Sequence, residues 1–177
     1  MQESLKAKRL SWTCDYAKAL SGMSLVFVAI DTPIHPEGID LGPIRKAVRA
    51  IARAARKPYV MVISSQVPVG ESQKLQASAR KLGPHCDVVC NPEFLRLGGA
   101  MELQRHPDRI VLGAEDAKAA GKVAKVYEAF GAPVLHMGLR EAELVKHATN
   151  AYVANQVSFI GEIAQICDEY GADCLPV

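Results

Sequence analysis

Apolar residues follow two alternating patterns between residues 25 and 136. Continuous β-prone runs are typical of strands buried on both faces of a parallel sheet. Stretches between them place apolar residues at helical spacing, as in an amphipathic helix. Strands are expected at 25–30, 59–63, 86–90, 109–113 and 133–136, and helices at 41–57, 71–82 and 116–130. A short strand at 10–13 and a short helix at 16–20 are also expected. This order predicts an α/β fold with right-handed crossovers and a parallel sheet.

The last apolar pattern is much longer than the others. From 141 to 170 the chain has no proline and a single glycine, and its apolar stripe predicts one helix roughly 45 Å long. Such a helix extends beyond a domain of this size, so part of it should pack against a partner subunit. We therefore expect a sheet-containing segment at 1–138, a helical segment at 139–177, and a homodimer formed through the helix 141–170.

Composition limits the classes of protein that remain. The chain has 177 residues, of which 49% are hydrophobic and 23% charged, as in a soluble globular protein. Its net charge of +2 indicates no partner by itself. Residues 1–10 lack the apolar core of a signal peptide, and no apolar run approaches the length of a membrane span. We expect a cytoplasmic protein without a membrane partner.

Cysteines, histidines and basic residues suggest no metal or nucleic acid. The five cysteines include no C-x-x-C pair and are expected to be free thiols in a reducing compartment. The five histidines show no paired metal spacing, so no metal is predicted. The basic face of the helix at 41–57 fits a solvated surface better than a nucleic-acid interface, because no aromatic or glycine-rich element accompanies it.

The loops that follow the first three sheet strands contain candidate functional residues. Thr32, Gln66 and Glu93 lie in loops at carboxyl strand ends, where open α/β sheets bind ligands. In the stretch 91–100, a carboxylate, an aromatic ring and a guanidinium lie between a proline and two glycines. Taken alone, this stretch is either a solvated loop or part of a ligand site.

Two polar residues on the long helix are also candidates. Lys146 and Asn150 are four residues apart, so they project from one helix face and could together stabilise an oxygen that becomes negative. A solvated helix face is the alternative. The sequence contains neither G-x-G-x-x-G nor a P-loop, and it has no serine nucleophile elbow.

Five strings in a fixed order nevertheless show a family resemblance. They are A-I-D-T-P at 29–33, S-Q-V-P-V-G at 65–70, N-P-E-F-L-R at 91–96, R-I-V-L-G at 109–113, and A-E-L-V-K at 142–146 with Asn150. In order and spacing they resemble the UDP-glucose and GDP-mannose dehydrogenase family. That family oxidises the C6 hydroxyl of a nucleotide sugar to a carboxylate with two NAD, through a cysteine thioester.

The resemblance implies roles for individual residues. Glu93 matches an active-site glutamate, and Lys146 and Asn150 would steady the oxyanion and water at C6. The backbone of Phe94, Leu95 and Arg96 would lie along the nucleotide sugar. The loop of Thr32 and Pro33 would face NAD. The resemblance also implies a partial Rossmann-like sheet followed by a long dimerisation helix.

Four departures from the family pattern shape the functional expectation. The sequence shows no family glycine fingerprint and no family cysteine nucleophile, Gln66 replaces a threonine that orients water, and Leu97 replaces a second glutamate. We expect a truncated homologue that binds a nucleotide sugar but does not complete the oxidation alone, and whose NAD binding is doubtful. The alternatives are an interaction module that pairs with a full-length dehydrogenase, an enzyme completed by another chain and, last, a nucleic-acid binder.

Overall fold

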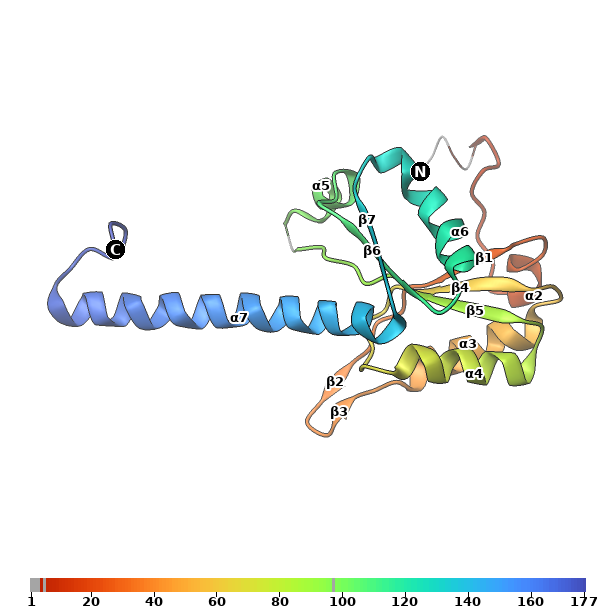
Figure 1. Ribbon diagram of the computed structural model, residues 1–177, viewed down its shortest axis with the longest axis horizontal. Helices are drawn as coiled ribbons and strands as arrows, with labels where there is room; N and C mark the ends of the chain where they lie inside the picture. Colours follow the sequence, from red (N-terminus) through yellow and green to blue (C-terminus); the bar gives the residue numbers. More distant parts are fainter. Residues whose placement is uncertain (1–3, 5, 97) are drawn as a thin grey trace.

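The protein folds as a five-stranded sheet with helices on both faces and a long carboxyl-terminal helix (Figure 1). The computed structural model describes residues 4, 6–96 and 98–177. Five strands form the sheet in the order β1-β4-β5-β6-β7, and β2 pairs with β3 in a separate hairpin. The strands are β1 Leu25–Val28, β2 Ile34–His35, β3 Gly38–Ile39, β4 Tyr59–Ile63, β5 Cys86–Cys90, β6 Ile110–Ala114 and β7 Val134–Met137. The helices are α2 Tyr16–Ala19, α3 Gly42–Ala54, α4 Glu71–Leu82, α5 Ala100–Arg105, α6 Ala117–Tyr127 and α7 Leu139–Tyr170, and a 3₁₀ turn covers Glu128–Phe130.

Strand β4 lies in the middle of the apolar core and is buried along its whole length, as its unbroken apolar run predicts. Met61 and Ile63 pack in the cluster that contains residues of α3, α4 and the start of α7. Val60 and Val62, one residue out of phase, pack with Val123 of α6 in the other cluster. This two-residue alternation fixes the register, because a slip by one residue would exchange the two faces.

One strand pairing differs from the all-parallel sheet that the sequence predicts. Strands β1, β4 and β5 are parallel and so are β6 and β7, but β5 and β6 pair antiparallel, with Cys90 opposite Gly113. A parallel neighbour needs a crossover, usually a helix, that returns the chain to the other end of the sheet. The segment between β5 and β6 contains only the six-residue helix α5. The chain therefore turns back at the same sheet end, and β6 runs in the opposite direction.

Smaller differences concern short elements. The short strand predicted at 10–13 is wrong, because these residues form no strand. Neither the β2–β3 hairpin nor α5 was expected. Both lie in loops whose sequences alternate polar and apolar residues too briefly for a periodic signal.

Helix α7 begins within the domain and ends far from it (Figure 1). Leu139, Ala142, Glu143 and Lys146 in its first two turns are buried, whereas most side chains after Asn150 are exposed. Along the described residues, no helix is long and apolar enough to cross a membrane.

The start of α7 lies against β6 at Gly113. A Cβ atom at this position would be 2.7 Å from the carbonyl oxygen of Gly138 and closer still to the Cβ of Ala142. Only a glycine lets the strand and helix approach this closely.

We predict that Gly113→Ala lowers the free energy of unfolding by about 1–3 kcal/mol, because the added methyl group overpacks a rigid contact. Gly121→Ala is the matched control. A Cβ atom there meets nothing within 4 Å, and it lies inside α6, so this change should stabilise by about 0.5–1 kcal/mol. Urea unfolding of the two variants measures both effects, and equal stability of the two variants would contradict the close approach.

Candidate functional site

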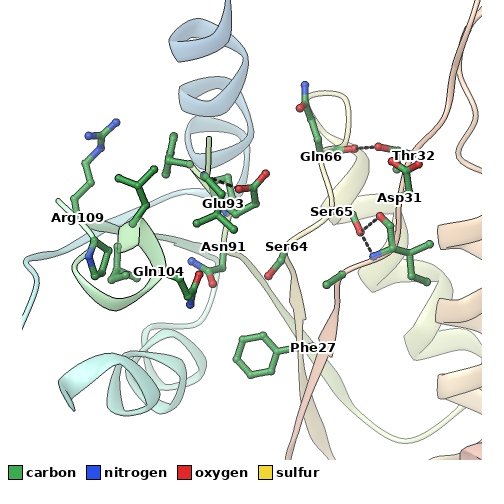
Figure 2. Close-up of a pocket in the computed structure, with 18 of the residues that line it drawn as sticks. Phe27, Asp31, Thr32, Ser64, Ser65, Gln66, Asn91, Glu93, Gln104 and Arg109 are labelled. Carbon is green, nitrogen blue, oxygen red and sulfur yellow. Dashed lines mark hydrogen bonds between the residues drawn. The ribbon is translucent and has the colours of Figure 1, made fainter. Parts of the chain in front are cut away.

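A cleft of about 670 Å³ opens at the carboxyl ends of β1, β4 and β5. The loops after these strands form its walls, as the sequence predicts for an open α/β sheet. Figure 2 shows Asp31, Thr32 and Gln66 on one wall and Glu93 and Arg109 on the other, with Ser64 and Asn91 between them. Phe27 of the edge strand β1, which is 43% exposed, also lines the cleft.

The Glu93 wall combines a carboxylate, an aromatic ring and two cations. Lys146 Nζ lies 3.7 Å from Glu93 Oε1 and 5.4 Å from the centre of the Phe94 ring. The guanidinium of Arg109 lies 4.7 Å from the same ring. The Lys146 side chain is only 11% exposed, whereas that of Glu93 is 48% exposed. An ammonium group this poorly solvated attracts negative charge more strongly than one in bulk water.

The opposite wall is held together by hydrogen bonds between two loops. Thr32 Oγ1 donates to the carbonyl oxygen of Gln66 at 2.9 Å. Ser65 Oγ accepts from the Ile30 N–H at 2.8 Å and donates to the Ile30 carbonyl oxygen at 2.6 Å. These bonds, drawn in Figure 2, fix the loop after β1 against the loop after β4. The hydroxyl proton of Thr32 is therefore engaged within the protein.

Asn91 forms the floor between the two walls. Its Nδ2 donates to the Val111 carbonyl oxygen at 3.0 Å, and its Oδ1 accepts from the Tyr127 hydroxyl. Burial raises the pKa of Tyr127, so its phenol stays protonated and can act as this donor. The amide thus links the end of β5 to β6 and α6. These bonds hold the start of the loop that leads from β5 to Glu93.

Glu143 attaches α7 to the rest of the site. Its carboxylate accepts from the N–H groups of Gly70 and Ser72, the latter at 2.7 Å, at the amino terminus of α4. A carboxylate is the favoured partner of a helix amino terminus, where backbone N–H groups lack intrahelical acceptors. Glu143 is 3% exposed. Through this bond Lys146 and Asn150, one and two turns further along α7, reach the two walls of the cleft.

The structure brings most of the predicted site residues together. Glu93, Phe94 and Lys146 are in contact on one wall, and Thr32 and Leu95 also line the cleft. Asn150 Nδ2 donates to Gln66 Oε1 at 3.4 Å on the opposite wall. Lys146 and Asn150 contact residues that line the cleft but do not line it themselves. Arg96 is exposed and Pro33 is half-buried, and they do not line it either. The prediction at Leu97 lies outside the described residues.

Sequence reasoning missed residues that support the site. Asn91, Tyr127 and Arg109 converge from three elements, and no local spacing announces this. Glu143 and His147 lie next to candidates within the A-E-L-V-K-H string, so their positions on one helix could have been noted. The signal in the sequence is a glutamate three residues before a lysine beside the apolar stripe of one helix, because charged side chains that become buried there each require a partner.

A cysteine next to the cleft residue Asn91 is held as a thiol. Cys90 ends β5 just before Asn91, and burial raises its pKa to about 12. A thiol, not the reactive thiolate, is therefore present at neutral pH. Among the residues that the structure describes, no three potential metal-binding side chains come together.

Two family models match the chain. Residues 1–131 match the UDP-glucose/GDP-mannose dehydrogenase family, NAD binding domain, and residues 140–177 match the central domain of the same family. The chain belongs to the UDP-glucose/GDP-mannose dehydrogenase family. Family membership confirms the resemblance expected from the motifs, whereas the division at residues 138 and 139 stays a prediction.

Curated and solved family members give the same assignment. The chain is 34% identical to the UDP-glucose 6-dehydrogenase TuaD of Bacillus subtilis, over 98% of this chain and 38% of that protein. It resembles the structure of a UDP-glucose dehydrogenase from Pyrobaculum islandicum with a TM-score of 0.92 and 36% identity, over 98% of this chain and 42% of the other. A GDP-mannose dehydrogenase from Pseudomonas aeruginosa gives the same TM-score and coverage at 28% identity. The chain thus spans about two fifths of the length of these relatives.

Two helix amino termini of the sheet domain do not fit the pyrophosphate of NAD. In dinucleotide-binding folds the pyrophosphate lies at a helix amino terminus with free N–H groups. The amino terminus of α4 already holds the Glu143 carboxylate, and at the start of α3 the Gly42 N–H donates to Asp40 Oδ1 at 2.7 Å. Both helix ends are thus filled by the protein's own carboxylates.

We predict that Glu143→Gln lowers the free energy of unfolding by about 1–3 kcal/mol, because an amide group replaces one of two acceptors facing buried N–H donors. Amide hydrogen exchange should accelerate at Gly70, Ser72 and along residues 139–150. Glu162→Gln, on the exposed part of α7, is the control and should change neither measurement. Unchanged exchange in Glu143→Gln would show that this carboxylate does not hold α7 in place.

Proposed function

We propose that this chain supplies the nucleotide-sugar wall and the oxyanion-stabilising cation of an NAD-dependent dehydrogenase that oxidises the C6 hydroxyl of a nucleotide sugar. The observation that carries this proposal is the position of Lys146, a nearly buried ammonium 3.7 Å from Glu93, which lines the cleft. The family's named members act on UDP-glucose or GDP-mannose, which supports a nucleotide sugar as the ligand.

The residues on the Glu93 wall and Asn150 each have a proposed task. Lys146 and an N–H of Asn150 stabilise the negative charge that develops on the C6 oxygen. Glu93 Oε2 accepts from the Leu95 N–H at 2.7 Å, so its Oε1 is the oxygen that faces Lys146 and the reacting group. The extended backbone from Phe94 to Arg96 binds along the sugar nucleotide, and the Arg109 and Lys146 cations on Phe94 keep that segment in place.

NAD would accept the hydride in such a reaction. The amino termini of α3 and α4 are filled by the protein's own carboxylates, so the proposal assigns this chain's residues to the nucleotide sugar alone. Thr32 and Pro33 remain predictions as residues that face the cofactor. Activity in the cytoplasm fits the five free cysteines of the described chain.

We predict that UDP-glucose binds the isolated chain and that Lys146→Met raises its dissociation constant by about tenfold, because one charge-assisted hydrogen bond is lost. Titration calorimetry with UDP-glucose, UDP-glucuronate and NAD measures this. Lys122→Met, on the exposed face of α6, should bind like the wild type. No heat with any of the three ligands would reject the proposal.

The exposed part of α7 favours a second candidate function, pairing with another dehydrogenase chain. Large apolar side chains continue along this helix where it has left the domain (Figure 1). The most exposed of them are Tyr152, Val157, Phe159, Ile160 and Tyr170. We propose that a second copy of the chain covers this face in a homodimer. A full-length homologue is the alternative partner, and a non-catalytic module of this kind would use the same face.

We expect light scattering to give twice the chain mass, and Val157→Glu with Phe159→Glu should shift the protein to a monomer, because two carboxylates would be buried without partners. Gln156→Glu adds one charge at an exposed polar position and is the control. A monomeric wild type that co-purifies with a complete dehydrogenase would favour the interaction module instead.

A further inference from the structure

A short chain of polar contacts joins α7 to the Gln66 wall. It begins at His147, whose Nε2 lies 2.9 Å from the Val67 carbonyl oxygen. A carbonyl oxygen can only accept, so Nε2 must carry a proton. In a neutral imidazole the other nitrogen, Nδ1, is then an acceptor. One backbone carbonyl thus determines the tautomer of His147.

The tautomer determines the orientation of the next two side chains. The Gln66 amide nitrogen lies 3.4 Å from His147 Nδ1, and it donates to that acceptor. The Gln66 amide oxygen therefore faces Asn150, whose Nδ2 donates to it at 3.4 Å. An amide nitrogen carries two protons, so one N–H of Asn150 points to Gln66 while its second N–H stays available to a ligand.

We propose that Gln66 and His147 are positioning residues that fix the amide of Asn150 with its nitrogen toward the Gln66 wall. A threonine at position 66 would end two bonds earlier than the glutamine amide and would not reach both partners on α7. The glutamine thus connects this wall to α7. The consequence for catalysis rests on the proposed function, since it is there that Asn150 donates to the C6 oxygen.

The orientation matters because the oxyanion needs a donor. An Asn150 side chain that rotated by half a turn would present its oxygen, which repels a negative oxygen instead of stabilising it. Holding the amide before the ligand arrives also removes the entropy loss of ordering it during binding.

Nuclear magnetic resonance of the free protein tests the positioning directly. In the full chain labelled with ¹⁵N, long-range correlations at pH 8 should show His147 protonated on Nε2 and not on Nδ1. In Gln66→Met, which keeps the shape without the amide, the tautomer should persist while the Asn150 side-chain N–H signals exchange faster with water. In Gln66→Glu, the carboxylate should draw a proton onto Nδ1 of His147, an effect that a space-filling role would not produce.

The variants of His147 separate its two contacts. His147→Asn keeps an acceptor near Gln66 and should leave the exchange of the Asn150 side-chain N–H signals with water unchanged. His147→Gln keeps a donor to Val67 without that acceptor, and exchange of those signals should be faster. Wild-type His147 protonated on Nδ1 alone, or Asn150 signals that Gln66→Met leaves unchanged, would overturn the proposal. Backbone spectra of each variant confirm that it folds.

Ligand binding then separates this proposal from the proposed function. Gln66→Met should weaken UDP-glucose binding about fivefold, the effect of one hydrogen bond. A wild type with the predicted tautomer and no UDP-glucose binding would retain the positioning of Asn150 and reject the proposed function. Unchanged binding in Gln66→Met would reject the positioning of Asn150 for catalysis.

Discussion

The arrangement of the site depends on one carboxylate. Glu143 on α7 accepts the free N–H groups at the start of α4, and this bond sets both the depth and the rotation of α7 against the sheet. Three residues later on the same helix face, Lys146 reaches Glu93 and, one turn beyond it, Asn150 reaches Gln66. A helix is stiff enough to transmit this placement over two turns, because each residue adds a fixed rise and rotation. Helix α7 thus joins the two walls of the cleft, because it contacts Glu93 on one and Gln66 on the other.

The same bond decides what the cleft can bind. A helix amino terminus beside a cleft is an anion site, and a free one would attract the phosphates of any nucleotide. Glu143 fills the amino terminus of α4, so that helix end does not compete for a phosphate. The cations beside the cleft are then Lys146, next to Glu93, and Arg109, over the Phe94 ring.

Features with a local cause were predictable from the sequence. Strand β4 and helix α4 lie where their apolar patterns place them, because burial on two faces or on one stripe leaves a period in the sequence. The reversal of β6 was not predictable, since it depends on α5 failing to cross the sheet. Glu93, Phe94 and Lys146 were predicted as site residues from a family motif, and the structure places them in contact. Asn91 and Glu143 escaped notice because their partners lie far along the chain, and single-sequence patterns contain no such pairing.

The partners of Lys146 within the protein do not fully replace the solvation that its ammonium group has lost, so the site favours a further negative group. A buried ammonium loses solvation that only a close partner restores, and Glu93 at 3.7 Å is beyond hydrogen-bond distance and half exposed to water. Water screens that carboxylate, so its attraction for Lys146 is weaker than its charge suggests. The Phe94 ring contributes a second, smaller attraction at 5.4 Å. A ligand oxygen that gains negative charge beside Lys146 would therefore supply the short contact that Glu93 does not, and the site should bind more strongly as that charge develops.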